Sequence, residues 1–298
     1  AQQKAEITYL TGKIGWAADY VLTLGADETS ADLTGWVTLR NHSGASYENA
    51  KLKLVAGDVQ KIRARDQEQA YGGEDFNGLS ELDDRKQQFT EEGFFEYHLY
   101  TLDRPTTLLD NEDKQVVLLE GHGIRTDKRL IFFGQQNYYR GSYGQVTSNQ
   151  KVGVFLDIEN KEANHLGIPL PKGIVRVYKA DASGAKQFIG EDAIDHTPRD
   201  EKLRIKMGES FDVVGDRVET NWKTLGTCRS ESTWEITLKN HKDTDQVVQD
   251  VEPVGGDWEI LKSSQPYVKQ DAHTFTFSVN VPSRKEIKIT YRVVVSWC

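Results

Sequence analysis

The pattern of apolar and polar positions along the chain predicts an almost entirely β-sheet protein. Short runs in which apolar and polar residues alternate recur from end to end, and turn residues separate them about every 8–12 residues. Alternation sends successive side chains to opposite faces of a strand, so each run can bury one face. No segment keeps the helical period of about 3.6 residues. Clear strand predictions fall at residues 4–10, 18–24, 34–39, 94–102, 152–160, 274–281 and 285–295.

A change in composition near residue 215 predicts two domains. Residues 1–215 are expected to form a large antiparallel β-sandwich-like domain. A polar, charged and glycine-bearing stretch at about 60–92 interrupts its strand pattern and is interpreted as an insertion, because loops of this length are usually functional or disordered. Residues 216–298 hold five short strand patterns, the span of a small immunoglobulin-like sandwich. The sequence shows no clear internal repeat.

Charge and hydropathy narrow the range of partners. The chain has 37 Lys and Arg against 46 Asp and Glu, a formal net charge of −9. Such a surface repels nucleic-acid phosphates and anionic lipid heads, so neither is an expected partner. No stretch reaches the roughly 20 apolar residues that a membrane-spanning helix needs. We therefore expect no transmembrane segment.

The two cysteines of the chain are Cys228 and Cys298, and Cys298 is the last residue of the sequence. A single disulfide that pins the C-terminal strand is the favoured interpretation. It would close a loop of about 70 residues and stabilise the fold by about 4 kcal/mol in the chain-entropy model. Disulfides follow the redox compartment, so the bridge accompanies a periplasmic, cell-surface or secreted location. The alternative is two unrelated thiols in a reducing cytosol.

The first candidate site lies in the strand pattern at 94–102. Glu96, His98 and Tyr100 would alternate to one face of that strand, and Arg104 follows its end. A Glu, a His and an Arg that converge can carry out acid–base chemistry or hold an anion. The competing interpretation is a polar strand face with a structural salt bridge from Arg104, and it is the more common arrangement.

The second candidate site is a cluster of oxygen and nitrogen ligands. The candidate ligands are Glu191, Asp192, Asp195, His196, Asp200 and Glu201. Ca²⁺ prefers such oxygen ligands, so Ca²⁺ is the one cofactor that the sequence offers. The spacing does not match an EF-hand loop, and an acidic surface turn is the favoured interpretation of these residues.

The third candidate site is aromatic. Tyr138, Tyr139 and Tyr143 stand in a glycine-spaced segment. Exposed rings of this kind stack on sugars or form protein interfaces, so these tyrosines are candidate contacts for a ligand or a partner. The alternative is a loop folded over the core.

Several segments together resemble the domain of unknown function numbered 4139, which is found in proteins similar to mucoidy inhibitor A. The segments are Trp16–Tyr20, Gly35–Leu39, Tyr97–Leu102, Leu166–Gly173 and Val175–Tyr178. They occur in order, and the resemblance covers most of the chain. It implies a bacterial, exported, β-rich protein with no established reaction. Longer relatives carry an N-terminal region, so the resemblance also implies a processed or shortened form.

These observations predict a non-catalytic, extracytoplasmic β-protein that acts through protein interaction or self-assembly, as a cell-surface or extracellular structural component. Other protein subunits are the expected partners, in a homo-oligomer or a filament. The common zinc, phosphate-loop, dinucleotide and nucleophile-elbow motifs are not found in the sequence. The alternatives are a hydrolase or metal-dependent enzyme at His98 or around His196, and a carbohydrate-binding module.

Overall fold

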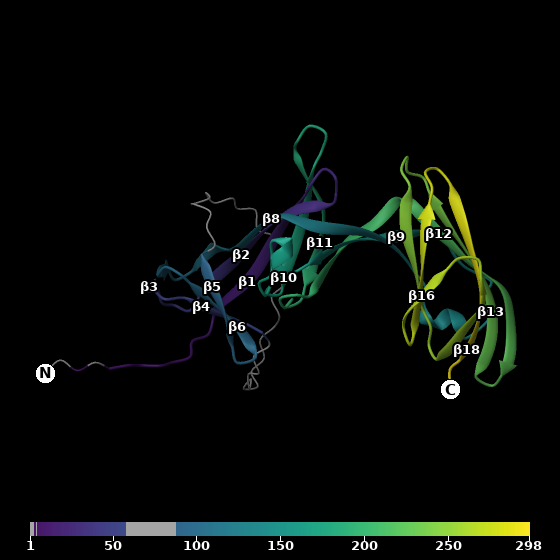
Figure 1. The fold of residues 1–298 in the computed structure, drawn as a ribbon. Helices are drawn as coiled ribbons and strands as arrows, with labels where there is room; N and C mark the ends of the chain where they lie inside the picture. Colours follow the sequence, from purple (N-terminus) through teal and green to yellow (C-terminus); the bar gives the residue numbers. More distant parts are fainter. Residues whose placement is uncertain (1–2, 4, 58–87) are drawn as a thin grey trace. The chain divides into compact units, whose positions relative to one another are not determined.

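The computed structural model describes residues 3, 5–57 and 88–298, and it confirms the all-β class (Figure 1). Regular structure in these ranges is β-strand, apart from two short 3₁₀ helices. The helices of the described chain are too short to cross a membrane. The insertion predicted at about 60–92 lies largely outside the described residues.

The chain folds into two compact units, and neither is one continuous stretch. Unit 1 consists of Ala1–Arg125 and Glu159–Leu203, and unit 2 consists of Thr126–Ile158 and Arg204–Cys298. The sequence-based division at residue 215 differs from this one. That division reads the chain as two consecutive pieces, whereas here the chain leaves unit 1, returns to it and leaves again.

Unit 1 is built on a sheet with the strand order β11-β10-β1-β2-β8, in which only β1 and β10 are parallel. Two small antiparallel sheets, β3-β7 and β4-β6-β5, accompany it. The strands are β1 (Ile14–Leu24), β2 (Ser30–Asn41), β3 (Tyr47–Ala50), β4 (Lys53–Ala56), β5 (Phe89–Phe94), β6 (Tyr97–Leu102), β7 (Thr106–Leu108), β10 (Gly173–Ala180), β11 (Lys186–Ile194) and the first part of β8 (Glu112–Phe133). The short helix η2 covers Glu162–Asn164.

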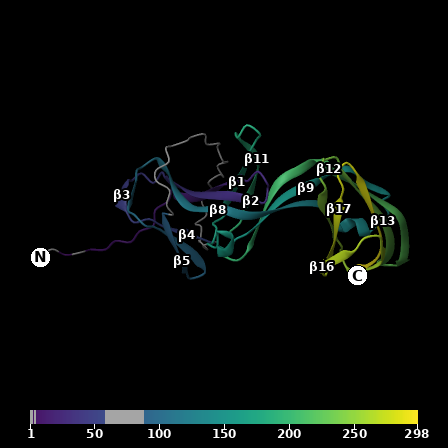
Figure 2. The same cartoon turned by 45° about the horizontal axis from the view of Figure 1, so that its top comes forward.

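Unit 2 pairs its strands in the order β16-β17-β14-β8-β9-β12-β13-β18-β15 (Figure 2). Its elements, beside the second part of β8, are η1 (Gln136–Tyr139), β9 (Gln145–Glu159), β12 (Lys202–Gly226), β13 (Arg229–Asn240), β14 (Gln246–Pro253), β15 (Asp257–Ser263), β16 (Tyr267–Asp271), β17 (Thr274–Val281) and β18 (Glu286–Ser296). Only the β14–β8 pair is parallel among the registered pairs of this unit. The immunoglobulin-like assignment stays a prediction.

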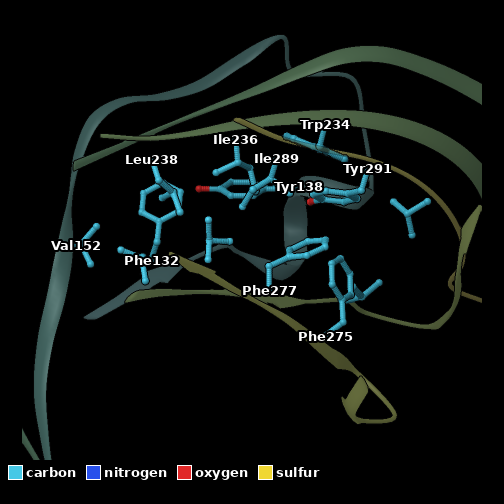
Figure 3. Close-up of a cluster of buried hydrophobic side chains, with 14 of the residues drawn as sticks. Phe132, Tyr138, Val152, Trp234, Ile236, Leu238, Phe275, Phe277, Ile289 and Tyr291 are labelled. Carbon is cyan, nitrogen blue, oxygen red and sulfur yellow. The ribbon is translucent and has the colours of Figure 1, made fainter. Parts of the chain in front are cut away.

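Alternation along each strand sets which face is buried. In β2 every second side chain from Ala31 to Asn41 is buried, while Asp32 and Arg40 are exposed. In unit 2 the inward side chains of β13, β17 and β18 form a core around Trp234, Phe277 and Tyr291 (Figure 3). Burial of large side chains contributes about 1.5–3 kcal/mol each, which makes this cluster the main apolar source of stability in unit 2.

The two units contain the same arrangement of five strands, which the sequence analysis did not anticipate. Strands β1, β2, β3, β7 and β8 of unit 1 correspond to β12, β13, β14, β17 and β18 of unit 2. The strand registers agree near the turns that follow β2 and β13, and they diverge beyond the β-bulges. Equivalent pairs are Ile14–Asn41 and Val213–Asn240, Arg40–Asp113 and Lys239–Glu286, and Tyr47–Leu108 and Gln246–Val281.

In unit 1, a buried asparagine side chain closes this arrangement. The side-chain amide of Asn41 donates hydrogen bonds to the backbone carbonyls of Ala45 and Leu109, each at 2.8 Å. Its side-chain oxygen accepts the backbone N–H of Ser43 at 3.1 Å. One side chain thus joins the turn after β2 to the turn before β8.

In unit 2, Asn240 makes the equivalent bonds. Its amide donates to the carbonyls of Thr244 at 2.8 Å and Val281 at 3.0 Å, and its oxygen accepts the N–H of Lys242 at 3.0 Å. The residues at the facing turn, Asn111 in unit 1 and Arg284 in unit 2, also share a left-handed backbone, with φ of 57° and 58°. The hydrogen bonds of Asn41 match those of Asn240, and the left-handed backbone of Asn111 matches that of Arg284. These two independent agreements identify a structural repeat.

Replacement of Asn240 by Ala is expected to lower the free energy of unfolding by about 2–4 kcal/mol, because buried carbonyls lose their donor. Asn280→Ala is the matched control: this side chain is exposed on β17, and the loss should stay within about 0.5 kcal/mol. Chemical denaturation measures both. Equal, small losses for the two variants would show that Asn240 does not close the turn.

The predicted disulfide is present. Cys228, in the turn between β12 and β13, is bonded to Cys298, and their Cα atoms lie 5.7 Å apart. The N–H of Trp297 also donates to the carbonyl of Cys228 at 3.0 Å. The end of the chain is therefore fastened to the β12–β13 turn by both a covalent and a hydrogen bond.

Cys228→Ser is expected to destabilise the protein by up to about 4 kcal/mol, because the bridge closes a loop of 70 residues. Cys298→Ser and the double variant should lose the same amount, since all three remove one bridge. Denaturant midpoints with and without reductant measure the effect. A double variant that loses twice as much as either single variant would contradict this account.

Candidate functional site

The β5–β6 hairpin carries the first predicted site, but it gives His98 a different partner. Phe95 and Glu96 form the two-residue turn between the strands, and Phe95 has φ of 59°. Glu96 is therefore not on the strand face where the alternation placed it. The residue that reaches His98 is Glu91 on β5, whose Oε1 lies 2.7 Å from His98 Nδ1.

The other two members of the predicted site lie apart from this pair. Arg104 is exposed beyond the end of β6, and in the described part of the chain it makes no ion pair with Glu96 or His98. The hydroxyl of Tyr100 points inward and donates to the carbonyl of Pro169 at 2.8 Å. Burial, followed by the negative charge of Glu91, raises the pKa of Tyr100 above its ordinary value.

The arrangement that results is a His–carboxylate pair on a hairpin. The side chain of His98 is 41% exposed and that of Glu91 is 22% exposed. Such a pair orients the imidazole and can exchange a proton with solvent. Among the described residues, no Ser, Thr or Cys side chain hydrogen-bonds to His98, so the geometry is not that of an activated nucleophile.

The acidic side chains of the second predicted site are directed to separate partners. Asp195 accepts the backbone N–H of His196 at 2.8 Å, and Asp192 accepts the N–H of Ala193. Asp200 has a left-handed backbone, with φ of 68°, and lies beside Arg199 at 3.8 Å.

Two further members of this set, Glu191 and His196, also have partners of their own. Glu191 lies 3.3 Å from Arg176 on the neighbouring strand, and His196 Nδ1 accepts the N–H of Lys172 at 3.2 Å. In the described ranges, no group of three His, Cys, Asp or Glu side chains is close enough together to hold a metal ion. The cluster that is contiguous in sequence is therefore spread out in space, and the geometry gives Ca²⁺ no support.

Two of the three tyrosines of the third predicted site belong to the core of unit 2. Tyr138 is 6% exposed and Tyr139 is 1% exposed, and Figure 3 shows Tyr138 among the core side chains. The ring of Tyr139 lies 5.7 Å from that of Trp234. Tyr143, at 46% exposed, is the only one of the three that presents its ring to solvent. The segment is the loop over the core that the alternative interpretation described.

A shallow depression of about 410 Å³ lies at the turn closed by Asn240. Its lining includes three cationic residues, Lys239, Arg284 and Lys285. Two of them already have carboxylate partners: Lys239 lies 2.6 Å from Asp216, and Arg284 lies 2.8 Å from Asp243. The depression is therefore largely neutralised and is a weak candidate for an anion site.

The most concentrated group of charges is buried in unit 2, and sequence reasoning missed it. The guanidinium of Arg217 on β12 contacts two carboxylates of β14: Asp250 at 3.0 Å, and Glu252. All three side chains are completely buried. The hydroxyl of Tyr139 donates to Glu252 at 2.5 Å and lies 2.8 Å from the hydroxyl of Tyr291. The alternation on β14 gave the signal, because Asp250 and Glu252 occupy its inward positions.

This group has one more carboxylate than it has cations, which makes a second full negative charge expensive. Burial, with the nearby Glu252, raises the pKa of Asp250 well above its ordinary value. The second carboxyl oxygen of Asp250 has no hydrogen-bond partner among the described residues. A proton on Asp250 removes the repulsion between the two carboxyl groups that contact Arg217. The group is a sealed structural network and not a site open to a ligand.

The folded protein therefore binds a proton that the unfolded chain releases, and stability should fall as pH rises through the raised pKa of Asp250. The loss begins near the ordinary aspartate pKa of about 4, is at most about 1.4 kcal/mol per pH unit, and levels off above the raised pKa of Asp250. Asp250→Asn keeps the shape without the proton, so its stability should lose this slope. Denaturation at several pH values measures the difference.

Asp243→Asn is the matched control for that series, because Asp243 is exposed and is paired with Arg284. It should keep the pH slope of the parent protein. A parallel pH dependence for Asp250→Asn and the parent would show that Asp250 is ionised in the fold.

Strand edges are the other feature that can contact a partner. In the described sheets, β11, β15 and β16 each pair on one side only. All three expose large apolar side chains: Phe188 (54%) and Ile189 (39%) on β11, Leu261 (40%) on β15, and Tyr267 (40%) and Val268 (59%) on β16. An edge strand offers unpaired backbone N–H and C=O groups, which template pairing with another strand.

Comparison with known proteins adds no assignment to this geometry. No family model matches the chain, and neither a curated protein nor a solved structure matches it. The resemblance to the domain of unknown function numbered 4139 stays a prediction from the sequence segments that carry it.

Proposed function

We propose that this protein is an extracytoplasmic, non-catalytic β-protein that acts through self-assembly. The observation that carries the proposal is the set of free strand edges with exposed apolar side chains, above all Phe188 on β11 and Val268 on β16. Strand addition at such an edge supplies backbone hydrogen bonds for affinity and side-chain contacts for specificity. A second copy of the chain is the simplest partner, because self-assembly requires no other protein.

The bridge between Cys228 and Cys298 supports the location outside the cytosol. Disulfides persist in oxidising compartments and are rare in reducing ones. The bacterial, exported character implied by the resemblance agrees with this location. A net charge of −9 keeps such a protein soluble and does not prevent pairing between particular strand edges.

The alternative functions receive less support from the geometry. Glu96 and Arg104, which the enzyme hypothesis combined with His98, lie apart from it. The acidic side chains around His196 accept separate hydrogen bonds. Of the three tyrosines that would stack on a sugar, only Tyr143 is exposed.

Light scattering after size exclusion tests the proposal. We expect a mass that is a multiple of 33.7 kDa, the mass of one chain. Phe188→Lys combined with Val268→Lys should lower that mass, because a charge on an edge strand opposes pairing. Val247→Lys is the control, since Val247 is 56% exposed but lies on β14, which is paired on both sides. A single 33.7 kDa species at all concentrations would contradict self-assembly.

A further inference from the structure

The segment Ala5–Gly12 has the sequence pattern of a strand but forms none. Figures 1 and 2 draw it as a coil ahead of β1. Its apolar side chains are almost fully exposed: Ile7 81%, Tyr9 66% and Leu10 102%. Among the described residues, no backbone group of this segment hydrogen-bonds to another backbone group. The side chains of Tyr9 and Thr11 make polar contacts with that of Tyr47. The strand predicted at 4–10 is not formed in the described part of this range.

The repeat shows what the equivalent segment does in unit 2. The N–H of His42 donates to the carbonyl of Lys13 at 2.8 Å, and the N–H of His241 donates to the carbonyl of Asp212 at 2.8 Å. Lys13 and Asp212 are therefore equivalent positions. The residues that precede Asp212 belong to β12, which begins at Lys202. In unit 2 the counterpart of Ala5–Gly12 is a strand.

That counterpart is a strand because β9 pairs with it. The strands β9 and β12 are neighbours in the sheet. Backbone hydrogen bonds mark both ends of the pairing: Asn160 N–H to the carbonyl of Glu201 at 2.9 Å, and Glu219 N–H to the carbonyl of Gly144 at 2.7 Å. The part of β12 that corresponds to Ala5–Gly12 lies between these two hydrogen bonds.

Unit 1 provides no such neighbour within the described residues. The pairing of β1 with β2 ends at Ile14 opposite Asn41, and its pairing with β10 begins only at Ala18 opposite Gly173. The segment before Ile14 therefore extends beyond both flanking strands. Among the described residues its backbone pairs with no strand, and Ile7 and Leu10 are almost fully exposed, while Tyr9 contacts Tyr47 only through its side chain. A segment in this state can be accepted as a strand by another chain.

We propose that Ala5–Gly12 adds as an extra strand to β11 of a second copy of this chain. The proposal rests on the self-assembly proposed above and names its donor and acceptor. β11 has nine residues, against seven in β15 and five in β16, so it is the free edge that best matches the length of the segment. It also exposes two large apolar side chains, Phe188 and Ile189, to an added strand, and Ile189 lies at a β-bulge.

The donor and the acceptor are different surfaces of one chain, so the contact is head-to-tail. A heterologous contact of this kind closes into a ring or continues as a filament. The smallest closed product is a reciprocal dimer, in which each copy donates its segment to β11 of the other. A contact that does not close in this way gives larger rings or a filament.

The test combines mass with amide hydrogen exchange on the 298-residue chain. In the assembled protein the amides of the segment should exchange at least about tenfold more slowly than in an unassembled variant. Ile7→Asp combined with Leu10→Asp should abolish the assembled species, and Phe188→Asp should do the same from the acceptor side. The melting temperature of the Ile7 and Leu10 variant should stay within about 2 °C of the parent, because these two side chains are almost fully exposed in the single chain.

Val247→Asp is the matched control and should assemble like the parent. A donor variant that still assembles, with the segment exchanging freely, would overturn this inference and leave self-assembly through another surface. A parent protein of 33.7 kDa with a fast-exchanging segment would overturn both proposals. A parent protein of 33.7 kDa in which the amides of the segment exchange slowly would show that the segment pairs within its own chain. That result would also contradict the proposal that a second copy is the partner.

Discussion

The structure depends on a hydrogen-bond constraint that it uses twice: a buried asparagine side chain that satisfies the carbonyls of two turns at once. Asn41 and Asn240 have no apolar contribution to make, yet each is buried in its unit. Carbonyls that leave a strand for a turn lose their ladder partners, and buried carbonyls without a donor are costly. The amide group supplies two donors and an acceptor in a fixed plane, which fixes the register of the five strands around it.

Both units contain this arrangement of five strands around a buried asparagine, but different side chains occupy its interior. Arg217 of unit 2 corresponds to Ala18 of unit 1, so among the residues that the structure describes only unit 2 encloses a charged network at that level of the sheet. A buried ion group contributes little net stability compared with apolar packing, but it disfavours every register in which its charges lose their partners. Unit 2 therefore has a core whose register is set by charge, whereas unit 1 relies on apolar side chains and on tyrosines such as Tyr20, whose hydroxyl donates to the carbonyl of Pro171.

The sequence predicted the features that are local and missed those that join distant segments. Alternation was enough for the all-β class, and two cysteines were enough for the disulfide. The partner of His98 was missed because Glu91 lies across a hairpin whose turn could not be placed from the pattern. The repeat had a visible signal, since Thr38-Leu39-Arg40-Asn41-His42 and Thr237-Leu238-Lys239-Asn240-His241 differ only by exchange of Arg for Lys. The discontinuous units had none, because strand pairing across a hundred residues leaves no mark on local periodicity.

Because the two units are interleaved along the chain, parts of one core are synthesised at different times. Thr126–Ile158 emerges from the ribosome long before Arg204–Cys298, with which it shares a core. During that interval the second part of β8 and most of β9 can pair only with each other. The core-facing side chains of Leu130 and Phe132 are then exposed to solvent. A half-built sheet of this kind is prone to pair with the wrong chain. The nascent protein therefore has to be shielded, or kept extended, until its last hundred residues arrive.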